Sequence, residues 1–208
     1  MLEHDTLAME ICIVCYDGFD ELDGVGPYEV FSYAARAGAD CTVSLCTLDE
    51  QESVTGSNGL TIQPDGTLED IPPDLLIVPG GGWNDRRDPS AWSEAQRGVL
   101  PERIGTLAAD GCTVAGVCTG GMLLAESGIL DGRQAVTHAS ALADLREYDD
   151  IEVVDARVVD SGEVLTAGGI TSGIDLALYL VEREFGEEIA DSVATTLEYE
   201  RRKAIHIT

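Results

Sequence analysis

The chain has 208 residues, of which 44% are hydrophobic, and this predicts one sizeable core rather than two full domains. Its charge is unusual, because 39 Asp and Glu against 12 Lys and Arg give a formal net charge of −27, and Lys203 is the sole lysine. The acids are dispersed along the chain, which favours a solvated surface adapted to a high-salt cytoplasm over a DNA-mimicking or cation-buffering role. Without a basic patch, binding to nucleic acid is not expected.

The N-terminal residues 1–9 carry acids and no apolar core of a signal peptide, so we expect a flexible leader followed by one domain over 10–208. Both Met1 and Met9 are candidate start residues. No run approaches eighteen apolar residues, so no membrane span is predicted and the protein is expected to be cytoplasmic.

The six cysteines are expected to be reduced thiols in this compartment. Cys12 and Cys15 form a C-x-x-C pair, but they lie in an apolar run typical of a buried strand. Positions three apart on a strand point to opposite faces, so these two sulfurs cannot share a metal or a disulfide. The same argument applies to Cys41 and Cys46. We therefore predict neither a metal site nor a disulfide from these four residues.

Strands and helices alternate along the rest of the chain. The first strand is expected at 11–16, and Gly24-Val25-Gly26-Pro27 opens a helix to Ala37, because Pro27 suits a first turn and Gly38 ends the helix. Further strands are expected at 41–48, 75–78, 113–117, 135–137, 151–154, 158–160 and 164–166, with a small hairpin of 54–55 and 61–63. Further helices are expected at 90–109, 119–126, 140–148, 174–185 and 187–197.

Short apolar strands alternating with helices predict an α/β fold, namely a three-layer, doubly wound, mostly parallel and flavodoxin-like sheet with helices on both faces. In such sheets a ligand site lies beyond the carboxyl ends of the strands.

The segment from Thr113 to Gly121 carries the most information about function. An apolar run ends at Cys118, Thr119 and two glycines follow, and helix formers continue to Glu126. This pattern is typical of a nucleophile elbow, in which a strand enters a tight turn and leaves it as a helix. The helix N-terminus stabilises a thiolate, so we expect Cys118 to be a nucleophile with a lowered pKa. A buried structural cysteine is the alternative.

Three other strand ends carry polar or glycine-rich segments. Asp23 stands before the first helix, where its carboxyl group could reach over the sheet. Pro79-Gly80-Gly81-Gly82 follows a short strand and suits backbone N–H groups directed at an oxyanion. Thr137-His138 follows a later strand, and His138 is either a structural residue or a proton carrier. Asp23 alone is a weak signal, because an acid before a helix is usually a cap, but the order acid, Gly-Gly, Cys, His is stronger than any part.

These residues resemble the ThiJ/PfpI superfamily, whose fold is related to class I glutamine amidotransferase domains. The resemblance runs from Ile11 to the C-terminus and is strongest at 22–31, 78–81, 117–120 and 166–175. Within the superfamily it points to the isonitrile hydratase branch and to the sensor domains of related transcription regulators. The regulators continue into a DNA-binding domain, whereas this chain ends at Thr208 after Arg201-Arg202-Lys203.

The resemblance implies that Cys118 is the nucleophile, that Asp23 is the acid paired with it, and that Thr119 donates its N–H group in the site. The Gly81 N–H would complete the oxyanion hole. Peptidase-like members carry a histidine directly after the nucleophile, where this chain has Thr119. Members are commonly dimers, so a homodimer is expected.

The side chains fit the chemistry that the resemblance implies. Like charges raise a carboxyl pKa, so Asp23 beside a thiolate would stay protonated and act as a proton donor. Cys118 would attack the terminal carbon of an isonitrile, and water would release an N-substituted formamide without a metal or organic cofactor. The alternatives are a glyoxalase or deglycase acting on α-oxoaldehydes, and a non-enzymatic redox sensor in which Cys118 becomes a sulfinic acid. Tyr16, Trp83 and Trp92 are candidates to line the cleft, with core packing as the alternative.

Overall fold

The computed structural model describes residues 8–208. The predicted leader at 1–9 therefore lies outside the described residues, except for its last two positions. Met9 already belongs to the first strand, which begins two residues earlier than the strand predicted at 11–16.

The structure alternates strands and helices along the chain. The longer helices are α1 (Glu21–Arg36), α2 (Ala91–Arg97), α3 (Val99–Ala109), α4 (Gly120–Glu126), α6 (Ser172–Phe185) and α7 (Glu187–Thr196), and the short ones are η1 (Ala139–Ala141) and α5 (Leu142–Leu145). The strands are β1 (Met9–Val14), β2 (Cys41–Thr47), β3 (Val54–Thr55), β4 (Thr61–Ile62), β5 (Gly66–Thr67), β6 (Leu75–Val78), β7 (Thr113–Val117), β8 (Gln134–Ala135), β9 (Glu152–Val153), β10 (Val158–Asp160), β11 (Val164–Ala167) and β12 (Ile205–Ile207).

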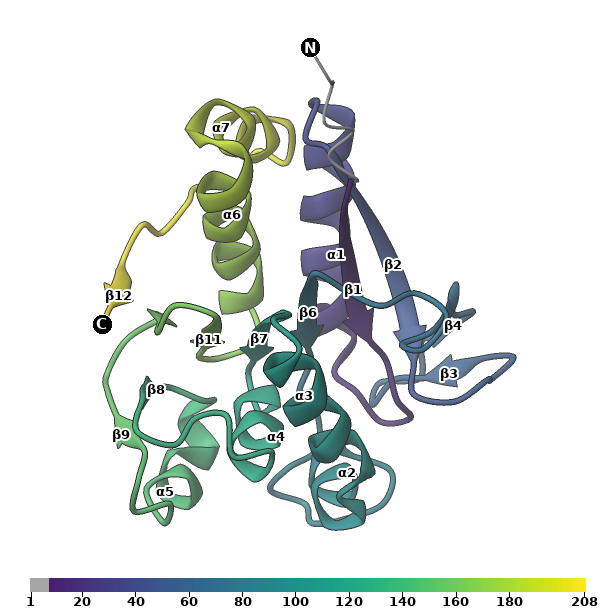
Figure 1. Ribbon diagram of the computed structural model, residues 1–208, viewed down its shortest axis with the longest axis vertical. Helices are drawn as coiled ribbons and strands as arrows, with labels where there is room; N and C mark the ends of the chain where they lie inside the picture. Colours follow the sequence, from purple (N-terminus) through teal and green to yellow (C-terminus); the bar gives the residue numbers. More distant parts are fainter. Residues whose placement is uncertain (1–7) are drawn as a thin grey trace.

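Within residues 8–208, eight strands form the main sheet in the order β12-β10-β11-β7-β6-β1-β2-β5. Neighbouring strands are parallel except for β10 and β11, which are antiparallel. Helices α1, α6 and α7 pack together on one face, and α3 and α4 pack against β7 on the other (Figure 1). The predicted α/β fold, a mostly parallel sheet covered by helices on both faces, is confirmed.

The sheet owes its parallel form to strands that are apolar on both faces. Every residue of β6 is buried, as are the last four residues of β1 and of β7. A strand buried on both sides needs a helix layer above and below, which the crossover connections of a parallel sheet supply. The carboxyl ends of β1, β6, β7 and β11 consequently meet at one edge, where the predicted site residues lie.

Helix α1 differs from its predicted start. It begins at Glu21 rather than at the Gly24-Pro27 segment, because the Asp20 carboxylate caps it by accepting the Leu22 N–H at 3.2 Å. Pro27 therefore lies inside the helix instead of in its first turn. A proline there removes the hydrogen bond that the Asp23 carbonyl would otherwise accept.

The remaining differences arise where local signals are weak. The predicted helix 90–109 is two helices, since Gly98 adopts a left-handed φ of 75° between them. The predicted helix 140–148 is reduced to η1 and α5. Strands β5 and β12 were not predicted, because each is two or three residues long and gains its hydrogen bonds from a distant strand. The hairpin of β3 and β4 is antiparallel, as predicted.

All six cysteines are free thiols and all are buried. The sulfur of Cys12 lies 3.1 Å from that of Cys46 on the neighbouring strand.

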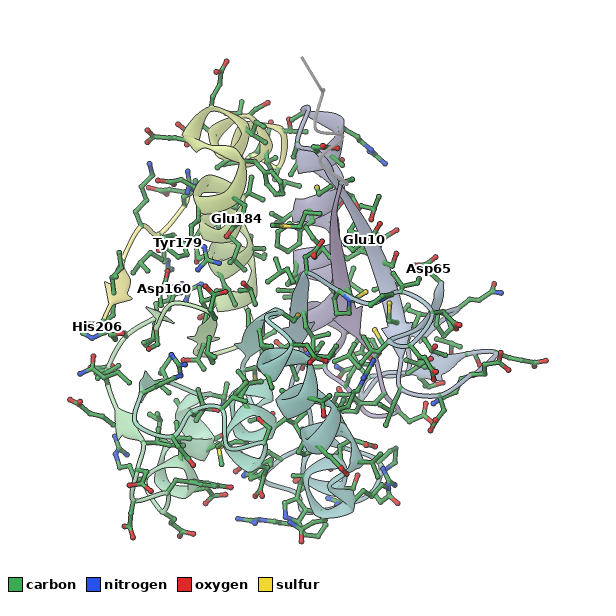
Figure 2. The ribbon with its side chains drawn as sticks, in the orientation of Figure 1. Glu10, Asp65, Asp160, Tyr179, Glu184 and His206 are labelled. Carbon is green, nitrogen blue, oxygen red and sulfur yellow. The ribbon has the colours of Figure 1, made fainter. Side chains whose placement is uncertain are left out.

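Carboxylate side chains surround the outline of the molecule (Figure 2). Others are buried and held by partners, such as Asp160 of β10, which accepts a hydrogen bond from the Tyr179 hydroxyl at 2.6 Å; both residues are labelled in Figure 2. In the described part of the chain, none of the helices is long and apolar enough to cross a membrane.

Candidate active site

Cys118 occupies the sharp turn between β7 and α4. Its φ is 57°, a left-handed conformation that is uncommon for a residue other than glycine. Its N–H donates to Ala167 O at 3.1 Å, which continues the ladder between β7 and β11 up to the turn. Gly120 makes the turn possible, since a Cβ there would lie 2.0 Å from Val78 O. The nucleophile elbow predicted at Cys118 has the backbone geometry of such a turn.

The turn is also fixed through the carbonyl of Cys118. The Thr137 hydroxyl donates to this oxygen at 2.8 Å, and the His138 N–H donates at 3.3 Å. The segment after β8 therefore contacts the elbow directly, as its place in the chain predicts.

Asp23 reaches the same place from the first turn of α1. Its side chain is completely buried, and Oδ2 accepts the Gly80 N–H at 3.0 Å. Oδ1 is buried with no hydrogen-bond partner. Burial, followed by the nearby Asp20 carboxylate, raises the pKa of Asp23 to about 8, although the Gly80 N–H and the Cys118 thiol each lower it. The raised pKa favours the protonated acid near neutral pH, and the Cys118 thiol is the side chain that interacts with this carboxyl group.

The thiol of Cys118 is only 6% exposed. Burial and the charge of Asp23 raise its pKa, against the Thr119 N–H, which lowers it. The lowered pKa that the helix N-terminus predicts for Cys118 is therefore wrong. One backbone N–H at the start of α4 stabilises the thiolate, but burial excludes the water that would otherwise solvate it, and this second effect is larger. Negative charges on both the thiol and the Asp23 carboxyl group would repel each other, so the two groups lose their protons in two separate steps.

The glycine loop does not present the oxyanion hole that the sequence predicts. The Gly80 N–H donates to Asp23, and the Gly81 N–H donates to Thr119 Oγ1 at 2.9 Å, so both are engaged within the protein. Gly80 is needed for close packing, since a Cβ there would lie 2.4 Å from Thr119 Oγ1. Thr119 itself is buried beside the thiol, with its N–H directed at sulfur. Its hydroxyl oxygen accepts from Gly81, which leaves its hydroxyl proton free to be donated.

His138 lies at the rim of the site and caps η1. Its Nδ1 accepts the Ser140 N–H at 3.1 Å. A backbone N–H can only donate, so Nδ1 is the unprotonated nitrogen and neutral His138 carries its proton on Nε2. In this tautomer the ring is a hydrogen-bond donor at Nε2 and not a base there, and its far edge packs beside Gly169.

Two residues near the site, Asp20 and Asp144, were not assigned by sequence reasoning, and a third, Tyr16, was predicted only as a candidate to line the cleft. Asp20 caps α1 and contributes to the raised pKa of Asp23. Tyr16 is buried and donates its hydroxyl to Pro79 O at 2.8 Å, which holds the start of the glycine loop. Asp144 accepts a hydrogen bond from Trp83 on that loop at 2.6 Å. The acid before a helix was a signal for Asp20, whereas nothing near Asp144 in the sequence points to the site.

No group of three or more His, Cys, Asp or Glu side chains is placed to hold a metal ion anywhere in residues 8–208. The donor set of the site itself is one thiol, one protonated carboxyl group and backbone or hydroxyl groups, which suits proton transfer and nucleophilic attack.

The fold and the site define an α/β protein with an elbow cysteine paired with a buried carboxylic acid. The DJ-1/PfpI family model matches residues 9–183, and the chain belongs to that family.

Its relatives differ in what they do. The chain is 36% identical to isonitrile hydratase of Pseudomonas putida over 200 residues, which are 93% of this chain and 79% of that protein. It is 30% identical to the Parkinson disease protein 7 homolog of Danio rerio, over 89% of this chain and 94% of that protein. It is also 30% identical to the transcriptional regulator CdhR of Pseudomonas aeruginosa, over 90% of this chain but only 54% of the regulator. The family thus includes an enzyme and regulators.

Solved structures show the same fold. A ThiJ/PfpI family protein of Pseudomonas syringae superposes with a TM-score of 0.81 at 24% identity, over 93% of this chain and 76% of that chain. DJ-1beta of Drosophila melanogaster superposes with a TM-score of 0.79 at 21% identity, over 93% of this chain and 99% of that chain.

Proposed function

We propose that the protein is a cysteine-dependent hydratase that converts an isonitrile and water into an N-substituted formamide. The observation that carries the proposal is Asp23, a fully buried carboxyl group with a pKa raised to about 8 and an unpartnered Oδ1, beside an elbow cysteine. An isonitrile needs a proton on the carbon that the nucleophile attacks, and a neutral carboxylic acid is a suitable donor. The 36% identity to an isonitrile hydratase supports the same choice.

In the first step the sulfur of Cys118 bonds to the terminal carbon of the isonitrile while Asp23 delivers its proton to that carbon. The thiol proton passes to the Asp23 carboxylate, so the acid is restored and the product is a neutral thioimidate, Cys118–S–CH=N–R. The pair carries no net charge before or after this step, which suits a buried site. The Thr119 hydroxyl proton is a donor left free at the elbow and would stabilise the charge that develops, while the Thr119 N–H already points at the Cys118 sulfur.

In the second step water adds to the C=N bond of the thioimidate, its oxygen to carbon and its proton to nitrogen. The C–S bond then breaks, the formamide leaves, and the hydroxyl proton returns to the sulfur through Asp23. Overall, one isonitrile and one water are converted into one N-substituted formamide. The step uses neither a metal nor an organic cofactor.

We also propose that the protein acts on a small molecule in a cytoplasm of high salt, and that it is a homodimer, as the family resemblance implies. The net charge of −27 supports the high-salt setting, because ions at molar concentration screen the repulsion.

We assign His138 to the rim of the substrate site as a donor rather than a base, since its neutral tautomer places the proton on Nε2.

The experiment is to give the purified protein cyclohexyl isocyanide in D₂O containing 2 M KCl. N-cyclohexylformamide should form with deuterium at the formyl carbon, because that hydrogen comes from the exchangeable Asp23 proton. Cys118→Ser should abolish the reaction, and Asp23→Asn should slow it by about 10²-fold or more, the usual contribution of a general acid. His138→Ala should cost far less. No formamide from the wild-type protein would contradict the proposal.

Methylglyoxal and hydrogen peroxide in parallel reactions test the two alternatives. Lactate formation that depends on Cys118, without formamide, would identify a glyoxalase. A stable sulfinic acid on Cys118 with no turnover of either substrate would identify a redox sensor.

A further inference from the structure

Two segments of the chain contact the Cys118 elbow. The glycine loop between β6 and α2 contacts it through the Gly81 N–H on Thr119 Oγ1. The segment that follows β8 and includes α5, residues 136–145, contacts it through the Thr137 hydroxyl on the Cys118 carbonyl. Because both contacts end on the elbow, the relative position of these two segments decides the geometry around the thiol.

Side chains farther from the thiol join the two segments to each other. We call Trp83, Asn84 and Arg86 of the glycine loop, with Ser140 and Asp144 of the other segment, the loop bridge. Asp144 Oδ2 accepts the indole N–H of Trp83 at 2.6 Å and the Arg86 guanidinium at 2.7 Å. Asn84 Nδ2 donates to Ser140 Oγ at 2.5 Å.

The Asp144 half of the loop bridge provides the acceptor for the buried indole N–H of Trp83. Trp83 is 4% exposed, so its N–H requires a protein acceptor, and one carboxylate oxygen serves it and a charged donor together. The Arg86 guanidinium also lies over the Trp83 ring, 5.9 Å from its centroid. Arg86 has a left-handed φ of 52°, a conformation that persists when the surroundings hold it.

The Asn84 half leads to His138. Ser140 is held by Asn84, its N–H donates to His138 Nδ1, and its hydroxyl lies 2.7 Å from the same nitrogen. A displacement of Asn84 in the glycine loop would therefore shift Ser140 and, through it, the orientation of the His138 ring.

We infer that Asp144 is a positioning residue, which through the loop bridge sets the spacing of the two segments that flank Cys118 and so controls access to its thiol. The inference extends the proposed function, on which its catalytic consequence rests. The predicted control of access to the Cys118 thiol does not depend on the substrate, so it remains testable if isonitriles are not substrates.

The test measures the alkylation rate of Cys118 by mass mapping with two reagents, iodoacetamide and the larger N-phenylmaleimide. In Asp144→Ala the loop bridge loses its acceptor, so the maleimide rate should rise several-fold relative to the iodoacetamide rate, because the larger reagent gains more when the two segments move apart. Asp144→Asn keeps an oxygen for Trp83 and should restore most of the wild-type ratio. Asp149→Ala removes an exposed acid beyond α5 and is the matched control, with no change expected.

Kinetics on cyclohexyl isocyanide provide the second readout. Asp144→Ala should lower kcat by about tenfold with a smaller change in KM, since the positioned groups act on the transition state. If the variant does not fold, Asn84→Ala breaks the other half of the bridge and should alter the same alkylation ratio. Folded Asp144→Ala with a wild-type alkylation ratio would overturn the inference, whatever its activity. A changed ratio without formamide production in any variant would leave the bridge standing and remove the proposed reaction.

Discussion

The buried carboxyl group of Asp23 should make the stability of the protein depend on pH in a way that one substitution removes. In the unfolded chain the group has its ordinary pKa of 3.8, and in the folded protein the pKa is about 8. Between these values the folded protein holds a proton that the unfolded chain has released. Stability therefore falls as the pH rises from about 4 to about 8, and it stays at the lower level above pH 8.

The size of the effect follows from the separation of the two pKa values. At about 1.36 kcal/mol per pH unit, roughly four units correspond to about 6 kcal/mol, and water entering the site would reduce this to a few kcal/mol. Asn at position 23 has nearly the same shape, can accept the Gly80 N–H and does not titrate. Asp23→Asn should thus be more stable than wild type at pH 8 while equal to it near pH 4.

The assay is urea unfolding of both proteins at several pH values in 2 M KCl, where the general repulsion among the acids is the same for each. Subtracting the two free energies of unfolding isolates position 23. Cys118→Ser serves as the control and should keep most of the wild-type pH dependence, because burial and not the thiol is the main cause of the raised pKa. Parallel curves for wild type and Asp23→Asn, differing by less than about 1 kcal/mol between pH 4 and 8, would refute the reasoning.

Three further predictions concern the thiols, the charge and the elbow. Cys118 should be alkylated by iodoacetamide before the other five cysteines, with a rate that climbs into the alkaline range because its pKa is raised; earlier labelling of Cys15 or Cys46 would contradict its role as nucleophile. KCl from 0.1 to 2 M should raise the melting temperature, because the Debye length shrinks from about 10 Å at 0.1 M to about 3 Å at 1 M and the repulsion among the 39 acids weakens. A melting temperature that does not change with KCl would exclude the high-salt interpretation. Gly120→Ala should destabilise the fold by about 1–3 kcal/mol or more in urea unfolding, because the added Cβ would overlap Val78 O. The control Gly105→Ala lies inside α3, where the added Cβ would have one contact at 3.3 Å, and should have little effect. Equal losses of stability in the two variants would show that the elbow is not tightly packed.

The sequence predicts the parts of the fold whose cause is local. Strands such as β6 and β10 have the predicted bounds, since their apolar runs end at proline, glycine or charged residues. The family resemblance and the strand ends together indicate Asp23, Cys118 and Thr119, and the structure brings all three to one place.

What the sequence does not predict depends on distance in the chain. The raised pKa of Cys118 results from burial by several elements, which no local pattern reports. The engagement of the Gly81 N–H by Thr119 joins residues 38 positions apart, and the contact between Trp83 and Asp144 spans 61. Such pairs become visible only when the carboxyl ends of the strands are placed side by side.

The left-handed backbone of Cys118 has a consequence for the history and the engineering of this chain. A non-glycine residue in that conformation costs of order 1 kcal/mol or more, and glycine at position 118 would relieve it. Asp23→Asn would remove a second cost, so the two simplest changes that strengthen the fold both eliminate the reacting groups. A library of variants selected only for resistance to heat should therefore accumulate inactive proteins with glycine at 118 or asparagine at 23. Natural descendants that retain both residues must be under selection for what the pair does.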